Sequence, residues 1–305
     1  MALFCSSIIK RVVVPKLTRK LVGCHLHTCA SRHAAAPPDD GSHLWLSSFG
    51  GGAVDLTKDD VSGLAVLTLN NPERLNAVTG NMMLQLADIV NDLKEWKGGK
   101  ALIVHGKGHT FCTGADLNMV RNMLDSKHGR EMCAFMHKTL TELHRLPLIS
   151  VTAIDGPAIG GGAELCTATD FRVMTEQAHI RFVQALLGIV PGWGGGTRLT
   201  RLVGRTRALD LLSSGRAISP EEAVEMGLAN WMIPTGHDVV EATTDWVQKY
   251  TKGKPEVVRA VKNVVVAGAE MSLEESLAEE AEQFVNVWGG PAHQEAMLRN
   301  ARHKK

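Results

Sequence analysis

The sequence has 305 residues, of which 44% are hydrophobic and 21% are charged, enough for one large domain or for a core with an appended segment. Its 33 Lys and Arg residues nearly balance 32 Asp and Glu residues, for a formal net charge of +1. A near-neutral chain has no net field that would attract nucleic acid or an anionic membrane, and no apolar run approaches the roughly 18 residues of a membrane-spanning helix. We therefore expect a soluble globular protein whose partners include neither nucleic acid nor a membrane.

The cysteine pattern indicates no metal site. None of the six cysteines lies in a closely spaced ligand pair. We therefore predict no bound metal, and thiols that stay reduced inside a cell. The cysteines are Cys5, Cys24, Cys29, Cys112, Cys133 and Cys166.

The N-terminal segment differs in composition from the rest of the chain. Residues 1–38 contain six Lys or Arg residues, and the first acidic residue is Asp39. This composition is typical of a mitochondrial transit peptide, and a disordered basic leader without a targeting role has the same features. We therefore expect residues 1–52, which end in the Gly50–Gly52 linker, to be a disordered leader.

Beyond the linker, short apolar runs alternate with segments of helical periodicity. Strands are predicted at residues 63–69, 101–106, 148–156 and 170–175, and helices at residues 81–96, after Asp116 and within the glycine run before residue 170. From residue 192 onward the pattern is almost entirely helical, with one helix beginning at Ser219 and ending at Gly227. This alternation predicts an α/β fold with right-handed crossovers and a largely parallel sheet, in which residues 53–200 form the core and residues 201–305 a helical region.

Two runs of small residues follow predicted strands. In FCTGADL, residues 111–117, Asp116 stands at an expected N-cap and leaves the amide of Ala115 free to point into a cleft. In GPAIGGGAEL, residues 156–165, the N–H groups of Gly160 to Gly162 become first-turn donors and form an anion site if a helix begins there. A tight turn packed against a strand is the alternative explanation for these glycines, and the helix dipole alone favours Glu164.

Two such amides can bind one developing oxyanion. Donors from Ala115 and Gly161 would stabilise an enolate or a tetrahedral intermediate, each by about 3 kcal/mol of activation free energy. The two runs together therefore predict an oxyanion hole.

Four motifs in order and spacing resemble the crotonase, or enoyl-CoA hydratase/isomerase, superfamily over residues 54–302. The resemblance implies a crotonase-like ββα spiral core and a helical C-terminal region that builds a homotrimer or a hexamer of two trimers. It also implies an acyl-CoA substrate whose thioester oxygen is bound by the amides of Ala115 and Gly161, without a separate cofactor because coenzyme A is part of the substrate. The motifs are NPERLNAV (residues 71–78), FCTGADL (111–117), GPAIGGGAEL (156–165) and LGIVPGWGGGTRL (187–199).

The resemblance also implies substrate contacts. Leu75 and Ala77 fall on the segment that lines the coenzyme A groove in the family, and Trp288 on a position near the adenine, with core packing as the alternative for this tryptophan. His179 is a possible proton source or a structural hydrogen-bonding residue, and Trp193 either forms a wall of the acyl pocket or fills the core. The remaining predicted contacts flank the two amides and are Gly114, Asp116, Leu117 and Gly160.

One position departs from the family pattern. Glu164 stands at the first of two glutamates that activate water in family hydratases, whereas Gln184 occupies the second. An amide neither takes up nor releases a proton near neutral pH, so the two-carboxylate mechanism of a hydratase and the single base of an isomerase are both missing. We therefore predict Glu164, Gln184, Ala115 and Gly161 as the catalytic residues of another reaction.

Decarboxylation of a malonyl-type thioester fits these residues. The departing carboxylate leaves its electrons as a thioester enolate, which the oxyanion hole stabilises without a base. Gln184 removes a negative charge that would repel the substrate carboxylate. The chain resembles a family member that converts 2-ethylmalonyl-CoA to butyryl-CoA, acts less well on methylmalonyl-CoA, and is a cytosolic metabolite-repair enzyme. We expect this activity in the cytosol, with the mitochondrial matrix as the alternative location.

Two other functions stay open. The chain could be an enoyl-CoA hydratase or an acyl-CoA thioester hydrolase that uses Glu164 alone. It could also bind RNA, as one relative of the family does, although the near-neutral charge argues against this function.

Overall fold

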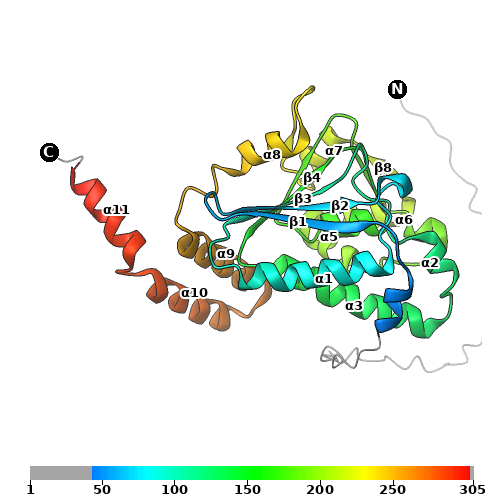
Figure 1. Ribbon diagram of the computed structural model, residues 1–305, viewed down its shortest axis with the longest axis horizontal. Coiled ribbons are helices and arrows are strands. Elements are labelled where there is room, and N and C mark those ends of the chain that lie inside the picture. Colours follow the sequence, from blue (N-terminus) through cyan, green and yellow to red (C-terminus); the bar gives the residue numbers. More distant parts are fainter. Residues whose placement is uncertain (1–42, 303–305) are drawn as a thin grey trace, which may run out of the picture. The chain divides into compact units, whose positions relative to one another are not determined.

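The computed structural model describes residues 43–302, whose strands form two sheets (Figure 1). The larger sheet has the order β1-β2-β3-β4-β6-β9, and only its β1–β2 pair is antiparallel. The smaller sheet has the order β5-β7-β8. This arrangement confirms the predicted α/β class with a largely parallel sheet. The strands are β1 (Ala53–Asp59), β2 (Leu64–Asn70), β3 (Ala101–Gly106), β4 (Ile149–Ile154), β5 (Pro157–Ile159), β6 (Phe171–Met174), β7 (His179–Arg181), β8 (Ala217–Ile218) and β9 (Trp231–Met232).

Helices connect most of the strands, as the alternating pattern predicts. Among the described residues, no helix combines the length and the apolar composition needed to cross a bilayer. The α-helices are α1 (Gly80–Glu95), α2 (Leu117–Arg121), α3 (Ser126–Arg145), α4 (Gly161–Cys166), α5 (Gly195–Val203), α6 (Arg205–Ser214), α7 (Pro220–Glu225), α8 (Val239–Val247), α9 (Pro255–Glu270), α10 (Leu273–Val287) and α11 (Pro291–Arg302). Three 3-10 helices complete the set: η1 (Leu44–Ser48), η2 (Pro72–Arg74) and η3 (Gln184–Leu187).

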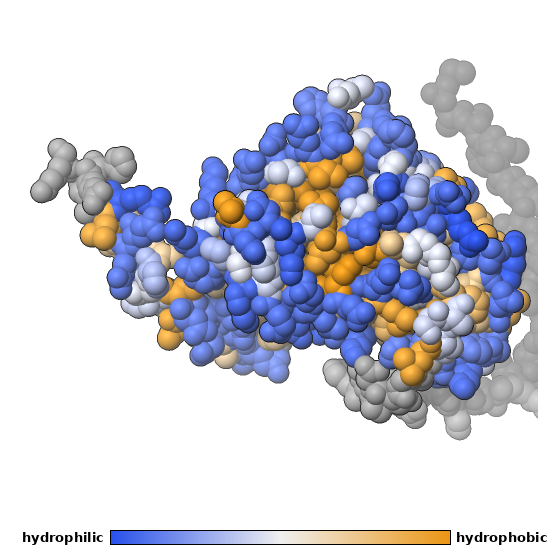
Figure 2. All heavy atoms as spheres, in the orientation of Figure 1, coloured by the Kyte–Doolittle hydropathy of each residue, from blue (hydrophilic) through white to orange (hydrophobic). Residues whose placement is uncertain are grey.

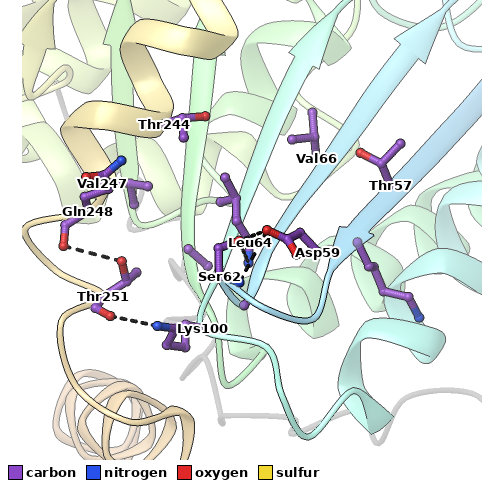
Figure 3. A pocket seen from close by; sticks show the side chains of 13 residues that line it. Thr57, Asp59, Ser62, Leu64, Val66, Lys100, Thr244, Val247, Gln248 and Thr251 are labelled. Carbon is purple, nitrogen blue, oxygen red and sulfur yellow. Dashed lines mark hydrogen bonds between the residues drawn. The ribbon is translucent and has the colours of Figure 1, made fainter.

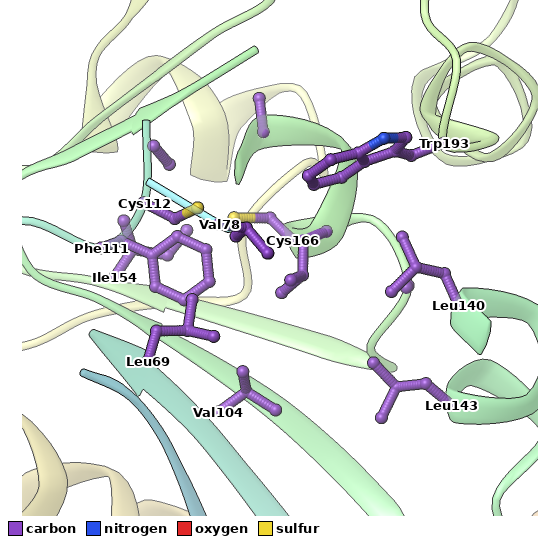
Figure 4. Close-up of a cluster of buried hydrophobic side chains, with 14 of the residues drawn as sticks. Leu69, Val78, Val104, Phe111, Cys112, Leu140, Leu143, Ile154, Cys166 and Trp193 are labelled. Carbon is purple, nitrogen blue, oxygen red and sulfur yellow. The ribbon is translucent and has the colours of Figure 1, made fainter. Parts of the chain in front are cut away.

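Apolar cores lie on both faces of the larger sheet. Helices α1 and α3 cover one face, and α8 covers part of the other (Figure 1). The main core joins residues of the sheet, such as Leu69 and Val104, to Leu140 and Leu143 of α3 (Figure 4). Strand β3 is buried along almost its whole length, which explains why its sequence is a continuous apolar run.

The ordered core extends beyond both predicted boundaries. Leu46 in η1 is fully buried in the main core, and the Thr79 hydroxyl donates a hydrogen bond to the Gly51 carbonyl (2.7 Å). The chain is therefore packed ahead of residue 53. After residue 200, β8 adds to the smaller sheet and β9 to the larger sheet. The core therefore continues into the region that was expected to be helical. The part of the predicted leader up to residue 42 lies outside the described residues.

A buried ion pair holds α9 against the core. Lys262 contacts a carboxylate oxygen of Asp170, and only 4% of the lysine side chain is exposed. The other oxygen of Asp170 accepts hydrogen bonds from the N–H and hydroxyl groups of Ser150 in β4 (2.8 and 3.0 Å). The pair therefore links α9, β4 and the segment that leads from α4 into β6.

We expect Asp170→Asn to lower the free energy of unfolding by about 3 kcal/mol, because it leaves the Lys262 ammonium buried without a counter-charge. Urea denaturation followed by circular dichroism measures the loss. As a control, the double variant Asp170→Asn/Lys262→Met removes both charges and should recover most of the stability. An unchanged free energy for the single variant would show that the ion pair does not stabilise the fold.

Candidate active site

The two segments that were predicted to carry oxyanion donors lie against each other. The loop after β3 is fixed by Val78, whose N–H donates to the Gly114 carbonyl (2.8 Å) and whose carbonyl accepts from the Asp116 N–H (2.9 Å). A Cβ atom built on Gly114 would lie 2.8 Å from the nitrogen of Gly161, the first residue of α4. Residues far apart in the sequence thus place the Ala115 loop directly beside the start of this helix.

The N–H groups of Ala115 and Gly161 are free to bind a ligand. Gly161 opens α4, so its N–H has no acceptor one turn earlier in the helix. Within residues 43–302, neither of these two N–H groups has a hydrogen-bond acceptor. The arrangement therefore has the two unpaired donors that an oxyanion hole requires.

The predicted N-cap residue holds the Ala115 loop in place. Asp116 accepts hydrogen bonds from the N–H groups of Asn118 and Met119 (2.9 and 3.1 Å), which confirms that it caps α2. Its other oxygen accepts from Arg74 Nη1 (2.6 Å). Burial alone would raise the pKa of Asp116, but these hydrogen bonds outweigh burial and leave the pKa below its usual value.

The glycines in this region have separate structural reasons. A Cβ atom on Gly161 would lie 2.7 Å from the ring of Trp193, and one on Gly162 would lie 2.1 Å from the Cys112 carbonyl oxygen. Gly160 has a φ of +56°, which glycine adopts without strain. Close packing therefore explains both Gly161 and Gly162, and the ring of the buried Trp193 lies directly over Gly161.

Glu164 is buried and its carboxylate is fully hydrogen-bonded. Oε1 accepts from Gln184 Nε2 (2.9 Å) and the Gly192 N–H (3.2 Å). Oε2 accepts from the N–H groups of Trp193 (2.7 Å) and Gly195 (2.8 Å). Since donors already fill both oxygens, the geometry suits a carboxylate that fixes the surrounding chain rather than one that receives a substrate proton.

Gln184 lies beside Glu164, as the family pattern predicts. It is the first residue of η3 and only 5% exposed. Its amide nitrogen donates to Glu164, but its Oε1 atom is buried and accepts from no donor among residues 43–302. The position of the missing second glutamate thus carries a neutral group with one unpaired acceptor.

The predicted coenzyme A segment runs beside the Ala115 loop. Leu75 and Asn76 have φ values of +52° and +53°, the only non-glycine residues with positive φ in the described part of the chain. The buried Asn76 amide holds this conformation by donating to the carbonyls of Lys107 (3.0 Å) and Thr110 (2.6 Å). Strained backbone of this kind is typical of functional loops, and it leaves Leu75 exposed whereas Ala77 is buried.

The charge of Glu164 affects the pKa values of three residues that were not predicted as site residues, Cys133, His137 and Arg198. Cys133 and His137 face each other on α3, with Sγ 3.7 Å from Nε2. Burial and then the charge of Glu164 raise the pKa of Cys133, while burial and Arg198 lower the pKa of His137. Arg198 donates to the Thr167 hydroxyl (3.0 Å) and the Trp193 carbonyl (2.6 Å). The four-residue spacing of Cys133 and His137 was the only sequence signal, and it says nothing of what they face.

One predicted substrate contact, Trp288, is not brought to this site within the chain. Trp288 lines a cavity of about 770 Å³ together with Asp60 and Lys100, which precede β2 and β3, whereas Ala115 follows β3. It therefore lies toward the opposite ends of these strands. We accordingly do not assign Trp288 to the site of the same chain. His179 begins β7 opposite Pro157, two residues before Arg181, whose carbonyl accepts from the Gly160 N–H (2.9 Å), and its role stays a prediction.

A second cavity, of about 550 Å³, lies on the β1–β2 side of the larger sheet next to α8 (Figure 3). Figure 3 shows Thr57 and Val66 of the hairpin on one side and Thr244 and Gln248 on the other. None of the predicted catalytic residues lines it, and no cluster of metal-ligating side chains occurs within residues 43–302. The candidate site is therefore the place where the Ala115 loop meets the start of α4.

We expect Glu164→Gln to lower the free energy of unfolding by about 2 kcal/mol, because an NH₂ group cannot accept hydrogen bonds from the backbone of the 192–195 turn. Chemical denaturation followed by tryptophan fluorescence measures the loss of free energy of unfolding. Glu176→Gln is the matched control, since Glu176 is an exposed carboxylate that accepts from Thr235 (2.8 Å). If both variants were as stable as the parent, Glu164 would not be the support of the turn.

Comparison with known proteins identifies the family. A family model described as enoyl-CoA hydratase/isomerase matches residues 59–304. Ethylmalonyl-CoA decarboxylase of Xenopus tropicalis is 49% identical over 260 residues, which cover 85% of this chain and 87% of that protein. The Homo sapiens protein of the same name is 44% identical over 262 residues, with 85% of each chain covered. The crystal structure of an enoyl-CoA hydratase from Bacillus anthracis superposes with a TM-score of 0.75 at 30% identity, over 84% of this chain and 97% of that one. The chain belongs to the enoyl-CoA hydratase/isomerase family and has the crotonase fold.

Proposed function

We propose that this protein is a carboxy-lyase that converts ethylmalonyl-CoA to butyryl-CoA and acts less well on methylmalonyl-CoA. Its relatives from Xenopus tropicalis and Homo sapiens are named ethylmalonyl-CoA decarboxylase, and their similarity extends over 85% of the chain. The observation that carries the proposal is the combination of two unpaired N–H donors with a buried Glu164–Gln184 pair in which only one member is a carboxylate.

The proposed reaction begins with cleavage of a carbon–carbon bond. The N–H groups of Ala115 and Gly161 bind the thioester oxygen. When the substrate carboxylate leaves as carbon dioxide, the electrons of the broken bond form the thioester enolate, whose charge falls on this oxygen. Each donor lowers the barrier by about 3 kcal/mol. A proton added to the α-carbon then completes the acyl-CoA product.

The same residues are poorly suited to hydration of a double bond. Water activation in family hydratases depends on two carboxylates, and here the second is Gln184, which cannot exchange a proton near neutral pH. Glu164 itself accepts four hydrogen bonds from the protein. We therefore assign Glu164 the role of orienting Gln184 and the 192–195 turn rather than that of activating water.

Substrate contacts are proposed along the loops that flank the donors. Leu75 and Ala77 would line the coenzyme A groove, and Gly114 and Gly160 would admit the thioester close to the backbone. Trp193 covers Gly161 and would form a wall of the acyl pocket. Asp116 fixes the Ala115 loop as the N-cap of α2, and the exposed Leu117 is the first residue of that helix.

A homotrimer, or a hexamer of two trimers, is the proposed assembly. An apolar groove of about 460 Å³ lies between α9 and α10, and hydrophobic side chains are visible on this part of the surface (Figure 2). Val261, Leu277 and Phe284 line the groove, and each is more than half exposed. Neighbouring subunits would cover these side chains.

We place the enzyme in the cytosol, where it would remove the side products of acyl-CoA carboxylation as a metabolite-repair activity.

A substrate panel tests the proposed function. We expect carbon dioxide release from ethylmalonyl-CoA, slower release from methylmalonyl-CoA, and neither hydration of crotonyl-CoA nor hydrolysis of butyryl-CoA. Radiolabelled carbon dioxide reports decarboxylation, loss of the ultraviolet absorbance of the conjugated enoyl thioester reports hydration, and thiol release reports hydrolysis. Hydration or hydrolysis without carbon dioxide release would contradict the proposal, and RNA binding whose log affinity falls linearly with log salt would indicate the other function class.

The oxyanion hole is tested at Gly161. Gly161→Pro removes the N–H donor, whereas Gly161→Ala keeps it, and both variants place a Cβ atom 2.7 Å from the Trp193 ring, which must shift in either case. We expect the proline variant to lose roughly a hundredfold in kcat/KM relative to the alanine variant. Circular dichroism and gel filtration check that both are folded. Equal losses in the two variants would show that this N–H is not an oxyanion donor.

A further inference from the structure

The orientation of the Gln184 amide is determined by its neighbour. Glu164 Oε1 lies 2.9 Å from the Gln184 amide nitrogen and, as a carboxylate oxygen, can only accept a hydrogen bond. The NH₂ end of the amide must therefore face Glu164, because the reverse orientation would bring two acceptors together. As a result, Gln184 Oε1 points away from the carboxylate.

That oxygen has no hydrogen-bond donor in the described part of the chain. Gln184 Oε1 is buried without a hydrogen bond, and no donor in residues 43–302 reaches it. A buried acceptor left without a partner costs about 1–3 kcal/mol, so such atoms are normally paired with ordered water or a ligand. The position next to Glu164 is therefore built to receive a donor from outside the chain.

Water is the donor that can both satisfy this atom and supply the proton that the proposed reaction needs. The ionised carboxylate and the thioester of a malonyl-type substrate carry no N–H or O–H group, and the amide N–H groups of the coenzyme A arm are too weakly acidic to protonate an enolate. The free N–H groups of Ala115 and Gly161 are already assigned to the thioester oxygen, and Glu164 has no proton to donate. A water molecule can donate one hydrogen to Gln184 Oε1 and keep the other for transfer.

We propose that Gln184 Oε1 positions a water molecule that protonates the α-carbon of the thioester enolate. The inference rests on the proposed decarboxylation. In this step a water O–H bond breaks, the enolate electron pair forms the new C–H bond, and the hydroxide left behind combines with carbon dioxide or a buffer acid. Gln184 is thus a positioning residue that acts through water, and the proton reaches one face of the planar enolate.

Decarboxylation of ethylmalonyl-CoA in deuterium oxide tests this role. The product is butyryl-CoA with one deuterium at C2, whose configuration shows the face that was protonated. We expect a large excess of one enantiomer from the parent enzyme, and a nearly equal mixture from Gln184→Leu, which has no acceptor. Gln184→Met is a second apolar variant for use if the leucine variant folds poorly. Gln177→Leu is the matched control, because Gln177 donates to a carboxylate of Asp155 (3.0 Å) and lies outside the site.

The two readouts separate the inference from the proposed function. Carbon dioxide release reports decarboxylation, and the configuration at C2 reports the source of the proton. A racemic product from the parent enzyme, or an unchanged enantiomeric excess in folded Gln184→Leu, overturns the role of Gln184. Loss of the excess in His137→Gln but not in Gln184→Leu also overturns it, by assigning the proton to the imidazole on α3. Absence of carbon dioxide release from the parent enzyme overturns the proposed function itself.

Discussion

The carboxylate of Glu164 joins three pieces of chain that are distant in the sequence. From α4 it binds the side chain of Gln184 and the backbone of the 192–195 turn. That turn carries Trp193, whose ring lies over Gly161, so the same carboxylate also sets the wall above the oxyanion donor. Because Gly161 and Glu164 share one short helix, the donor, the wall and the neutral amide are held at fixed positions relative to one another. A site preorganised in this way has little need to rearrange when charge develops.

The charge of this carboxylate is balanced without a direct ion pair. Arg198 donates to the carbonyls of Glu164 and Trp193, so its positive charge lies behind the turn rather than on the carboxylate. Burial lowers the pKa of Arg198 to about 10, which still leaves it charged at neutral pH. Glu164 is thus surrounded by backbone N–H groups and one neutral amide, and Arg198 contacts carbonyl groups rather than the carboxylate.

Local chemistry made some features predictable from the sequence. Asp116 caps α2 and Gly161 begins α4 because short-range hydrogen bonds and glycine conformation decide both. The family pattern then brought Gln184 beside Glu164. Other features depend on contacts between distant segments. Strands β5, β7 and β8 have two or three residues, too few for a periodic pattern. The backbone donors to Glu164 come from a turn nearly 30 residues away. The position of Trp288 depends on how α10 and α11 pack, which the order of the motifs does not encode.

Gln184 also bears on how such a site changes through evolution. Glutamine and glutamate codons differ only in the first base, so a second glutamate is a single mutation away. The barrier to that change is electrostatic. Gln184 lies at hydrogen-bond distance from a carboxylate whose other contacts are all donors. A glutamate there would set two negative charges against each other in a buried position, and one would have to hold a proton. A second carboxylate at this position therefore requires either a shared proton or a change in the 192–195 turn that supplies the other donors to Glu164.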